Sequence, residues 1–250
     1  MKKVVITQSI EQTKDFVTLL NSINLEVTVF PVIKVVPLPI NQNLKEIFFQ
    51  LETYDWVLFN SINSVRYFFF ILMNQFLKFP RSQPKIACLG QKTVDTLKTY
   101  GKNAQYFSEN IPVNSFYQSF MEENNIESGN RILVPLSREE LNSENFMKKA
   151  SCDCSFLEIY ETKMNSFIPQ PQIEQILSSD DLIITFFNPL AVENFLKLIP
   201  ANKFKPKWSI IAGGDDTAEA LGQISDVRMI KAKASQSSAL FEEVKRIVEV

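Results

Sequence analysis

The sequence predicts an α/β protein built from two parallel β-sheets, each with helices on both faces. Short β-rich segments alternate with amphipathic segments along all 250 residues. This alternation is typical of parallel sheets covered by helices. The expected strands are too many for one small sheet, so we expect two domains of about five strands each.

Each expected strand is a short apolar, β-branched run, and each expected helix repeats apolar residues every three or four positions. In chain order the strands are 3–7, 26–30, 55–59, 85–89, 104–107, 131–135, 155–161, 181–186, 208–212 and 227–230. The helices are 10–21, 44–51, 64–76, 92–100, 114–123, 140–149, 189–198, 217–223 and 237–248. Ser9 and Gln12 fit a capping box, and Asn188 before Pro189 fits an N-cap followed by proline.

The segment 31–39 interrupts this alternation, because it is extended, β-branched and enclosed by prolines. Prolines suit an edge strand or a linker rather than a central strand. We therefore expect the chain to cross between domains here, and to cross again near 161–167.

Two strand–turn–helix units recur in the same order. Segment 55–65 is similar to 181–192, and segment 86–97 is similar to 210–221. Any two such units look alike, so one pair alone would carry little weight. Two pairs in the same order favour a duplicated domain.

The composition excludes several classes of function. Histidine is absent and the net charge is −2, which argues against imidazole catalysis, histidine metal sites and nucleic-acid binding. The nucleotide-binding glycine motifs are missing, so we expect no cofactor. Without histidine we also expect no metal. Cys88, Cys152 and Cys154 are expected to be incidental thiols.

The chain shows no sign of a membrane or secretion signal. Its N-terminus reads as a first strand rather than a signal peptide, and its longest apolar run, 67–73, is far shorter than a bilayer span. We expect a cytoplasmic protein with no membrane partner.

Polar turns follow successive strands at 7–9, 60–63, 90–93, 136–138, 187–188 and 213–217. In open α/β sheets ligands bind at this edge, where helix N-termini present free N–H groups to anions. Ser, Thr and Asn also cap helices in any α/β protein, and for a single turn capping is the more common role. Two rims of such turns would suit a large ligand with many carboxylates.

Seven segments together resemble the uroporphyrinogen-III synthase family over essentially the whole chain. They are 5–7, 30–31, 54–65, 86–93, 131–135, 159–162 and 214–218. The resemblance implies two similar parallel-sheet, flavodoxin-like domains joined by a two-stranded linker. Domain 1 would be discontinuous at 1–33 plus 165–250, domain 2 would span 38–160, and the linkers would be 34–37 and 161–164.

The resemblance also implies an activity: a cofactor-independent lyase that cyclises hydroxymethylbilane to uroporphyrinogen III, with inversion of ring D and loss of water. This linear tetrapyrrole polycarboxylate is reactive by itself, so positioning matters more than strong acid or base groups. Tyr160 matches the family's tyrosine and is the expected catalytic proton donor. The expected substrate-binding residues are Thr7, Ser61, Asn63, Ser137, Arg138, Asn188 and Thr217. We expect a monomer that makes at most transient contact with the upstream bilane-forming enzyme.

Some turns depart from the family pattern, at Gln8, Asn60, Phe187 and the pair Asp215 and Asp216. They keep open a non-catalytic two-domain binder of an anionic small molecule, derived from the same fold. A third alternative is an unrelated cofactor-free transferase that shares only the architecture.

Overall fold

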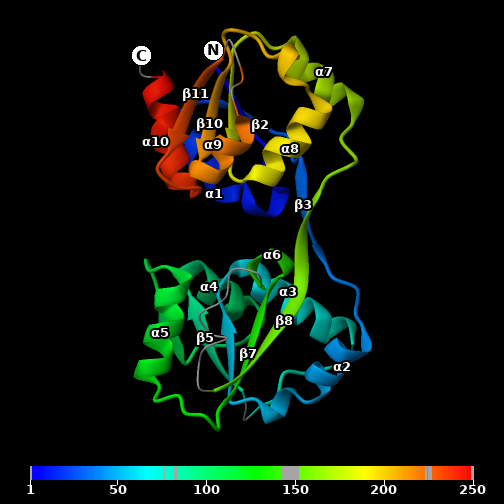
Figure 1. Cartoon of the computed structure of the whole chain (residues 1–250), viewed down its shortest axis with the longest axis vertical. Coiled ribbons are helices and arrows are strands. Elements are labelled where there is room, and N and C mark those ends of the chain that lie inside the picture. The colour runs from blue at the N-terminus through cyan, green and yellow to red at the C-terminus, as the bar shows by residue number, and fades with distance from the viewer. Residues whose placement is uncertain are drawn as a thin grey trace. The chain divides into compact units, whose positions relative to one another are not determined.

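The structure is a computed structural model that describes residues 2–75, 77–81, 84–141, 152–222, 224 and 227–248. It is a two-domain α/β fold with mostly parallel sheets, which confirms the predicted fold class (Figure 1). The chain divides into two compact units: unit 1 comprises residues 1–35 and 163–250, and unit 2 comprises residues 36–162. The finer domain and linker bounds given above stay a prediction.

Unit 1 holds a five-stranded sheet in the order β11-β10-β9-β1-β2, and the strand pairs are parallel. Its strands are β1 (Lys3–Ile6), β2 (Glu26–Val29), β9 (Leu182–Phe186), β10 (Ser209–Gly213) and β11 (Arg228–Ala232). Its helices are α1 (Lys14–Asn21), α7 (Gln170–Ser178), α8 (Pro189–Leu198), α9 (Asp215–Leu221) and α10 (Ser237–Val248), with 3-10 turns at Ile10–Gln12 and Ala201–Lys203.

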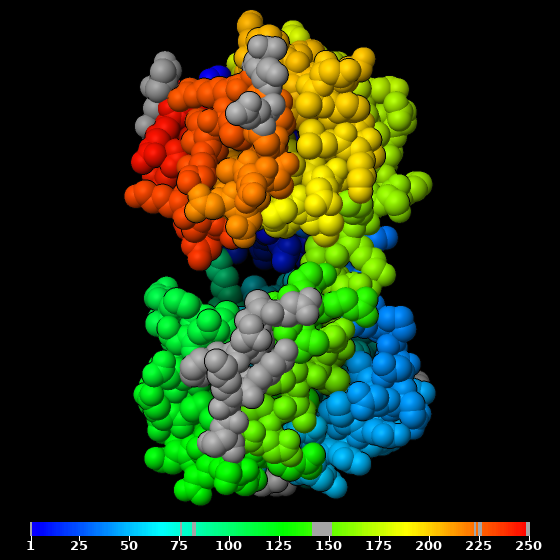
Figure 2. Space-filling model, in the orientation of Figure 1, coloured from blue at the N-terminus to red at the C-terminus, as the bar shows by residue number. Residues whose placement is uncertain are grey.

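Helices cover both faces of this sheet because apolar side chains alternate along its strands. Val4 and Ile6 point into a core with α1 and α10, whereas Val5 points into a core with α7, α8 and α9. The alternation has the period of two that an extended strand imposes. In the space-filling view, α8 (yellow) and α9 (orange) cover one face (Figure 2).

Unit 2 holds the sheet β3-β8-β7-β4-β5-β6. Its strands are β3 (Ile33–Pro37), β4 (Trp56–Phe59), β5 (Lys85–Leu89), β6 (Tyr106–Ser108), β7 (Arg131–Ser137) and β8 (Asp153–Met164). Its helices are α2 (Gln42–Phe49), α3 (Ile62–Asn74), α4 (Gln91–Thr99), α5 (Val113–Glu123) and α6 (Arg138–Leu141), with a 3-10 turn at Leu51–Thr53.

The strands β3 and β8 carry the chain between the units. They run antiparallel, since Leu38 N donates to Ile159 O and Asn165 N donates to Val32 O.

Both units share one strand arrangement, entered by the chain at different points. Unit 1 reads β2-β1-β9-β10-β11, which is the doubly wound order 2-1-3-4-5. Without the edge strand β3, unit 2 reads β8-β7-β4-β5-β6. Its strands β4, β5 and β6 therefore occupy the places that β9, β10 and β11 occupy in unit 1. The switch point therefore lies between β1 and β9 in unit 1, and between β7 and β4 in unit 2.

The recurring turns have matching backbone geometry, as a duplication predicts. Ser61 (φ −154°, ψ 161°) and Asn188 (φ −158°, ψ 161°) each cap the third residue of the following helix. Gly90 and Gly214 begin α4 and α9 with φ of 86° and 90°, a left-handed conformation that favours glycine.

Two local predictions need correction or stay open. The capping box at Ser9 is wrong: its hydroxyl donates to Gln12 Oε1, and the expected helix 10–21 is a 3-10 turn followed by α1. Most of the helix expected at 140–149 lies outside the described residues. In the described part of the chain, no helix is long and apolar enough to cross a membrane.

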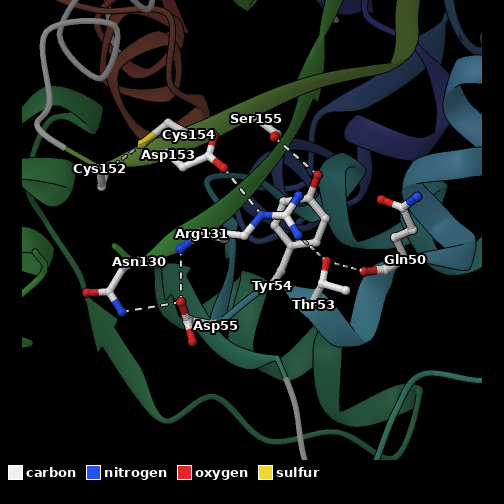
Figure 3. Close-up of polar contacts among 10 residues, drawn as sticks. All are labelled: Gln50, Thr53, Tyr54, Asp55, Asn130, Arg131, Cys152, Asp153, Cys154 and Ser155. Atoms are coloured by element: carbon white, nitrogen blue, oxygen red, sulfur yellow. Dashed lines mark hydrogen bonds and ion pairs between the residues drawn. The ribbon is translucent and has the colours of Figure 1, made fainter. Parts of the chain in front are cut away.

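A polar cluster around Arg131 joins the amino ends of β4, β7 and β8 (Figure 3). Asp55 Oδ2 accepts from Arg131 N at 2.9 Å, Arg131 Nε contacts Asp153 at 3.3 Å, and the guanidinium lies over the Tyr54 ring. Ligands of such sheets bind at the opposite, carboxyl edge, so we assign this cluster a structural role. Cys152 and Cys154 lie beside this cluster. Both are free thiols, and their sulfurs are 2.7 Å apart.

Candidate functional site

The candidate site lies at the carboxyl edge of the unit 2 sheet, at its switch point. Ser61 follows β4, and Ser137 ends the neighbouring strand β7. On β8 the residue paired with Ser137 is Tyr160, after a register shift between Leu136 and Ser137. A bulge of this kind redirects the side chains that follow it. The topology thus brings three predicted residues to one place.

Tyr160 is held at both its oxygen and its ring. Its hydroxyl lies 3.1 Å from Ser61 Oγ and donates to Glu140 Oε2 at 3.2 Å. Its ring stacks on Tyr67 with centroids 5.2 Å apart and an interplanar angle of 20°. Ser61 caps α3 and Tyr67 lies on the same helix, so α3 contacts both ends of the side chain. Only 5% of Tyr160 is exposed.

The surroundings keep the Tyr160 phenol protonated. Burial raises the pKa of Tyr160 well above its ordinary value, and the negative charge of Glu140 raises it further. The hydrogen bond with Ser61 acts in the opposite direction and is outweighed. The group is therefore a hydrogen-bond donor at neutral pH, with its proton directed at Glu140.

Glu140 was not among the residues predicted from sequence. Its Oε2 accepts from Ser137 N at 2.8 Å, while Ser137 Oγ accepts from Glu140 N at 3.1 Å. This reciprocal pair is a capping box, and the Ser-x-x-Glu spacing from Ser137 was the signal that could have revealed it. Tyr67 was also missed, although it lies on the helix that Ser61 caps.

Asn60 holds the other oxygen of Glu140. Its Nδ2 donates to Glu140 Oε1 at 3.4 Å, and also lies 3.5 Å from the Tyr117 hydroxyl. Its Oδ1 is buried with no hydrogen-bond partner among the described residues.

Arg138, a predicted carboxylate-binding residue, is already engaged by carboxylates. Its Nε contacts Glu158 at 3.2 Å and its Nη1 contacts Glu161 at 2.9 Å. Glu139 also lies here, accepting from Thr162 N at 3.0 Å. Glu158 and Glu161 thus pair with Arg138, while Glu139 and Glu140 follow it in the sequence.

In unit 1, Asn188 and Thr217 line one pocket of about 500 Å³ at the carboxyl ends of β9 and β10. Asn188 Oδ1 accepts from Ala191 N at 2.9 Å, and Thr217 Oγ1 donates to Gly213 O at 3.0 Å. The pocket is also lined by Phe187, Pro189, Gly213, Gly214, Asp215, Asp216, Lys233, Ala234 and Ser235.

Two predicted residues lie apart from these contacts. Thr7 is fully buried at the end of β1, and its hydroxyl donates to Thr185 O at 2.7 Å. It does not line the unit 1 pocket. Asn63 is buried in the first turn of α3. The substrate contacts expected of both stay predictions.

Comparisons with known proteins agree on one family. The family model described as uroporphyrinogen-III synthase HemD matches residues 14–242. A candidate uroporphyrinogen-III synthase of Methanocaldococcus jannaschii is 25% identical over 88% of this chain and 88% of its own length. The porphyrin biosynthesis protein HemD of Ruminiclostridium josui is 23% identical over 98% of this chain, which spans 48% of that longer protein.

Two solved structures share the fold. The uroporphyrinogen-III synthetase of Helicobacter pylori gives a TM-score of 0.60 at 15% identity, covering 99% of this chain and 100% of that one. A mutant uroporphyrinogen III synthase of Thermus thermophilus gives 0.50 at 16% identity, covering 100% and 99%. Since the family model spans most of the sequence, the chain belongs to the uroporphyrinogen-III synthase family.

Proposed function

We propose that the protein cyclises hydroxymethylbilane to uroporphyrinogen III, with inversion of ring D and loss of water. Family membership supports this assignment, and one observation in the fold carries it: a protonated, buried phenol at the switch point, held by Ser61 beside Glu140. In this proposal Tyr160 donates a proton to the ring A hydroxyl, which leaves as water. A positioned proton donor contributes about 10²- to 10⁴-fold in rate.

The remaining barrier is lowered by orientation of the bilane. Well-positioned intramolecular reactions gain up to about 7–11 kcal/mol, so a reactive substrate needs little further help. We propose that the carboxylates bind to N–H groups and hydroxyls at the turns that contain Thr7, Ser61, Asn63, Ser137, Asn188 and Thr217. Such groups offer neutral donors, which suits a site whose arginine is already paired.

The enzyme would be a lyase that needs no cofactor and acts as a cytoplasmic monomer. Its domains would be 1–33 plus 165–250 and 38–160, with linkers at 34–37 and 161–164. These statements extend the family assignment. Cofactor independence is measured by activity after dialysis against chelator, the oligomeric state by sedimentation, and the linker bounds by limited proteolysis.

The decisive experiment feeds freshly prepared hydroxymethylbilane to the purified protein and separates the oxidised ring isomers. Type III product well above the spontaneous type I background is the expected result. Type I alone, together with measurable bilane binding, would identify a non-catalytic binder. No binding at all would overturn the proposed activity; an unrelated enzyme that shares only the architecture is already excluded, because the family model matches residues 14–242.

A further inference from the structure

Glu140 is the carboxylate that touches the Tyr160 phenol, and its position suggests a role in the proton transfers of cyclisation. We propose that Glu140 accepts the pyrrole N–H proton of ring A as the ring A hydroxyl leaves, and that Glu140 then passes this proton to Tyr160. The inference rests on the proposed function and adds a second reacting group to it.

The hydrogen bonds at Tyr160 run in one direction. The phenol has one proton, which it donates to Glu140 Oε2, so the Ser61 hydroxyl donates to the phenol oxygen. When Tyr160 gives its proton to a leaving hydroxyl, this direct link to Glu140 is broken. The phenol oxygen is then negatively charged and 3.2 Å from a carboxylate oxygen.

Such a pair of negative charges is unfavourable in a buried site. Like charges a few ångströms apart repel strongly, and Tyr160 is almost fully buried. The phenolate must therefore regain a proton promptly. Glu140 is within hydrogen-bond distance to deliver that proton.

The substrate itself supplies the proton, so the step balances without a further reactant. The C–O bond of the hydroxymethyl group breaks, and the departing oxygen takes the Tyr160 proton to form water. The ring A nitrogen loses its N–H proton to Glu140, and the freed electron pair forms the C=N bond of the azafulvene. Glu140 then passes this proton to Tyr160, and both groups regain their starting state.

The local contacts distinguish Glu140 from the other glutamates. Ser137 N and Asn60 Nδ2 bond its two oxygens, and the residue is half-buried. Glu139 instead bonds the backbone of Thr162. The other two glutamates at this edge, Glu158 and Glu161, pair with Arg138.

The test compares Glu140→Gln with Glu139→Gln, a matched removal of one charge from the neighbouring position. Glu140→Gln keeps the size of the side chain but loses the proton acceptor, so the rate of type III formation should fall about 10²- to 10⁴-fold. Glu139→Gln should stay within about threefold of the parent rate, because a removed charge without a contact to the phenol has a small effect. Glu140→Asp, which keeps a carboxylate, should recover part of the lost activity.

A second measurement follows the Tyr160 phenol without substrate. Ultraviolet titration of the tyrosines, with Tyr160→Phe used to assign the signal, should show this phenol ionising at lower pH in Glu140→Gln than in the parent. The Glu139→Gln shift should be smaller, since Glu139 and Glu140 are the two carboxylates that raise this pKa and Glu140 acts more strongly.

The outcomes separate this role from the proposed function. A parent protein that forms type III product while Glu140→Gln matches Glu139→Gln would overturn the Glu140 role alone. A phenol that ionises at the same pH in the parent and in Glu140→Gln, within the range where both stay folded, would overturn it as well. A parent that forms no type III product would overturn both proposals, whatever the variants do.

Discussion

Replacing Tyr160 by Phe removes one oxygen and leaves the ring in place. The hydrogen bond to the Glu140 carboxylate is of the charged kind, about 1.5–3 kcal/mol, and the one to Ser61 of the neutral kind, about 1 kcal/mol. Glu140 keeps two other donors and the ring keeps its stack on Tyr67, so these values are upper limits. We expect a loss of about 2 kcal/mol in the free energy of unfolding.

A domain with about 5–15 kcal/mol of stability survives this loss, so activity can be measured on folded protein. The rate of type III formation should fall about 10²- to 10⁴-fold, the usual contribution of a general acid. The assay is a stopped incubation with fresh bilane, oxidation to porphyrins and separation of isomers, corrected for spontaneous type I product.

Tyr54→Phe is a matched control, because Tyr54 is a buried tyrosine of the same unit whose hydroxyl donates to Ser155 Oγ at 3.1 Å. It lies in the cluster at the amino edge of the sheet (Figure 3). Its variant should lose about 1 kcal/mol of stability, the value of one neutral hydrogen bond, but keep its rate. If Tyr160→Phe forms type III product within about twofold of the parent, the donor role of Tyr160 is refuted.

Three further predictions concern Tyr67, Gly213 and Cys88. Tyr67→Leu removes a stacking partner worth about 0.5–1.5 kcal/mol, so kcat should fall about 2- to 10-fold; Tyr67→Phe should restore it, and equal rates for the two would contradict a positioning role. In Gly213→Ala the new Cβ would lie 3.0 Å from Ser235 Cα, so urea unfolding should show a loss of about 1–3 kcal/mol. Gly129→Ala, which meets nothing within 4 Å, is its control, and equal losses would show the close approach to be irrelevant. Burial raises the pKa of Cys88 to about 12, so its thiol should resist alkylation at pH near 8.5 in the native state and react on unfolding. Burial of the neutral thiol contributes fully to the free energy of unfolding below the thiol's unfolded pKa, and this contribution is lost as the pH rises toward about 12. Rapid alkylation of the native protein would contradict the burial.

The strands could be predicted because local sequence is enough to specify them. In β1 the residues Val4, Val5 and Ile6 are all buried, and their alternate directions match two separate cores. A two-residue period and β-branched side chains need no knowledge of distant partners. All ten expected strands are present, with ends that differ by a few residues.

Elements with mixed local signals were harder. The β3 segment carries β-branched residues and flanking prolines, which fit a linker or an edge strand equally well, and it forms the edge strand next to β8. Near Ser9 the spacing fits a capping box, but the hydroxyl bonds a side chain instead of a backbone N–H. Spacing alone does not determine which of these bonds forms.

The candidate site depends on contacts that no local pattern contains. Ser61 and Tyr160 were each predicted, but they are 99 positions apart. They meet because β4, β7 and β8 are neighbours, with a register shift between β7 and β8 just before Tyr160. The pairing of Arg138 with Glu161, 23 positions later, arises in the same way. A charge that looks free in the sequence is therefore neutralised in the fold.

This neutralisation bears on how a polycarboxylate could be held. Arg138 is paired with Glu158 and Glu161, and Glu140 contacts the Tyr160 phenol, so these side chains do not attract an anion to the phenol. Helix N-termini still offer N–H groups, because the cap on α3 satisfies the Ser64 N–H and leaves others in the first turn without an intrahelical partner. Capping and anion binding are therefore compatible at this turn. In that case the Ser61 hydroxyl serves the helix and Tyr160, while neighbouring backbone N–H groups bind the ligand.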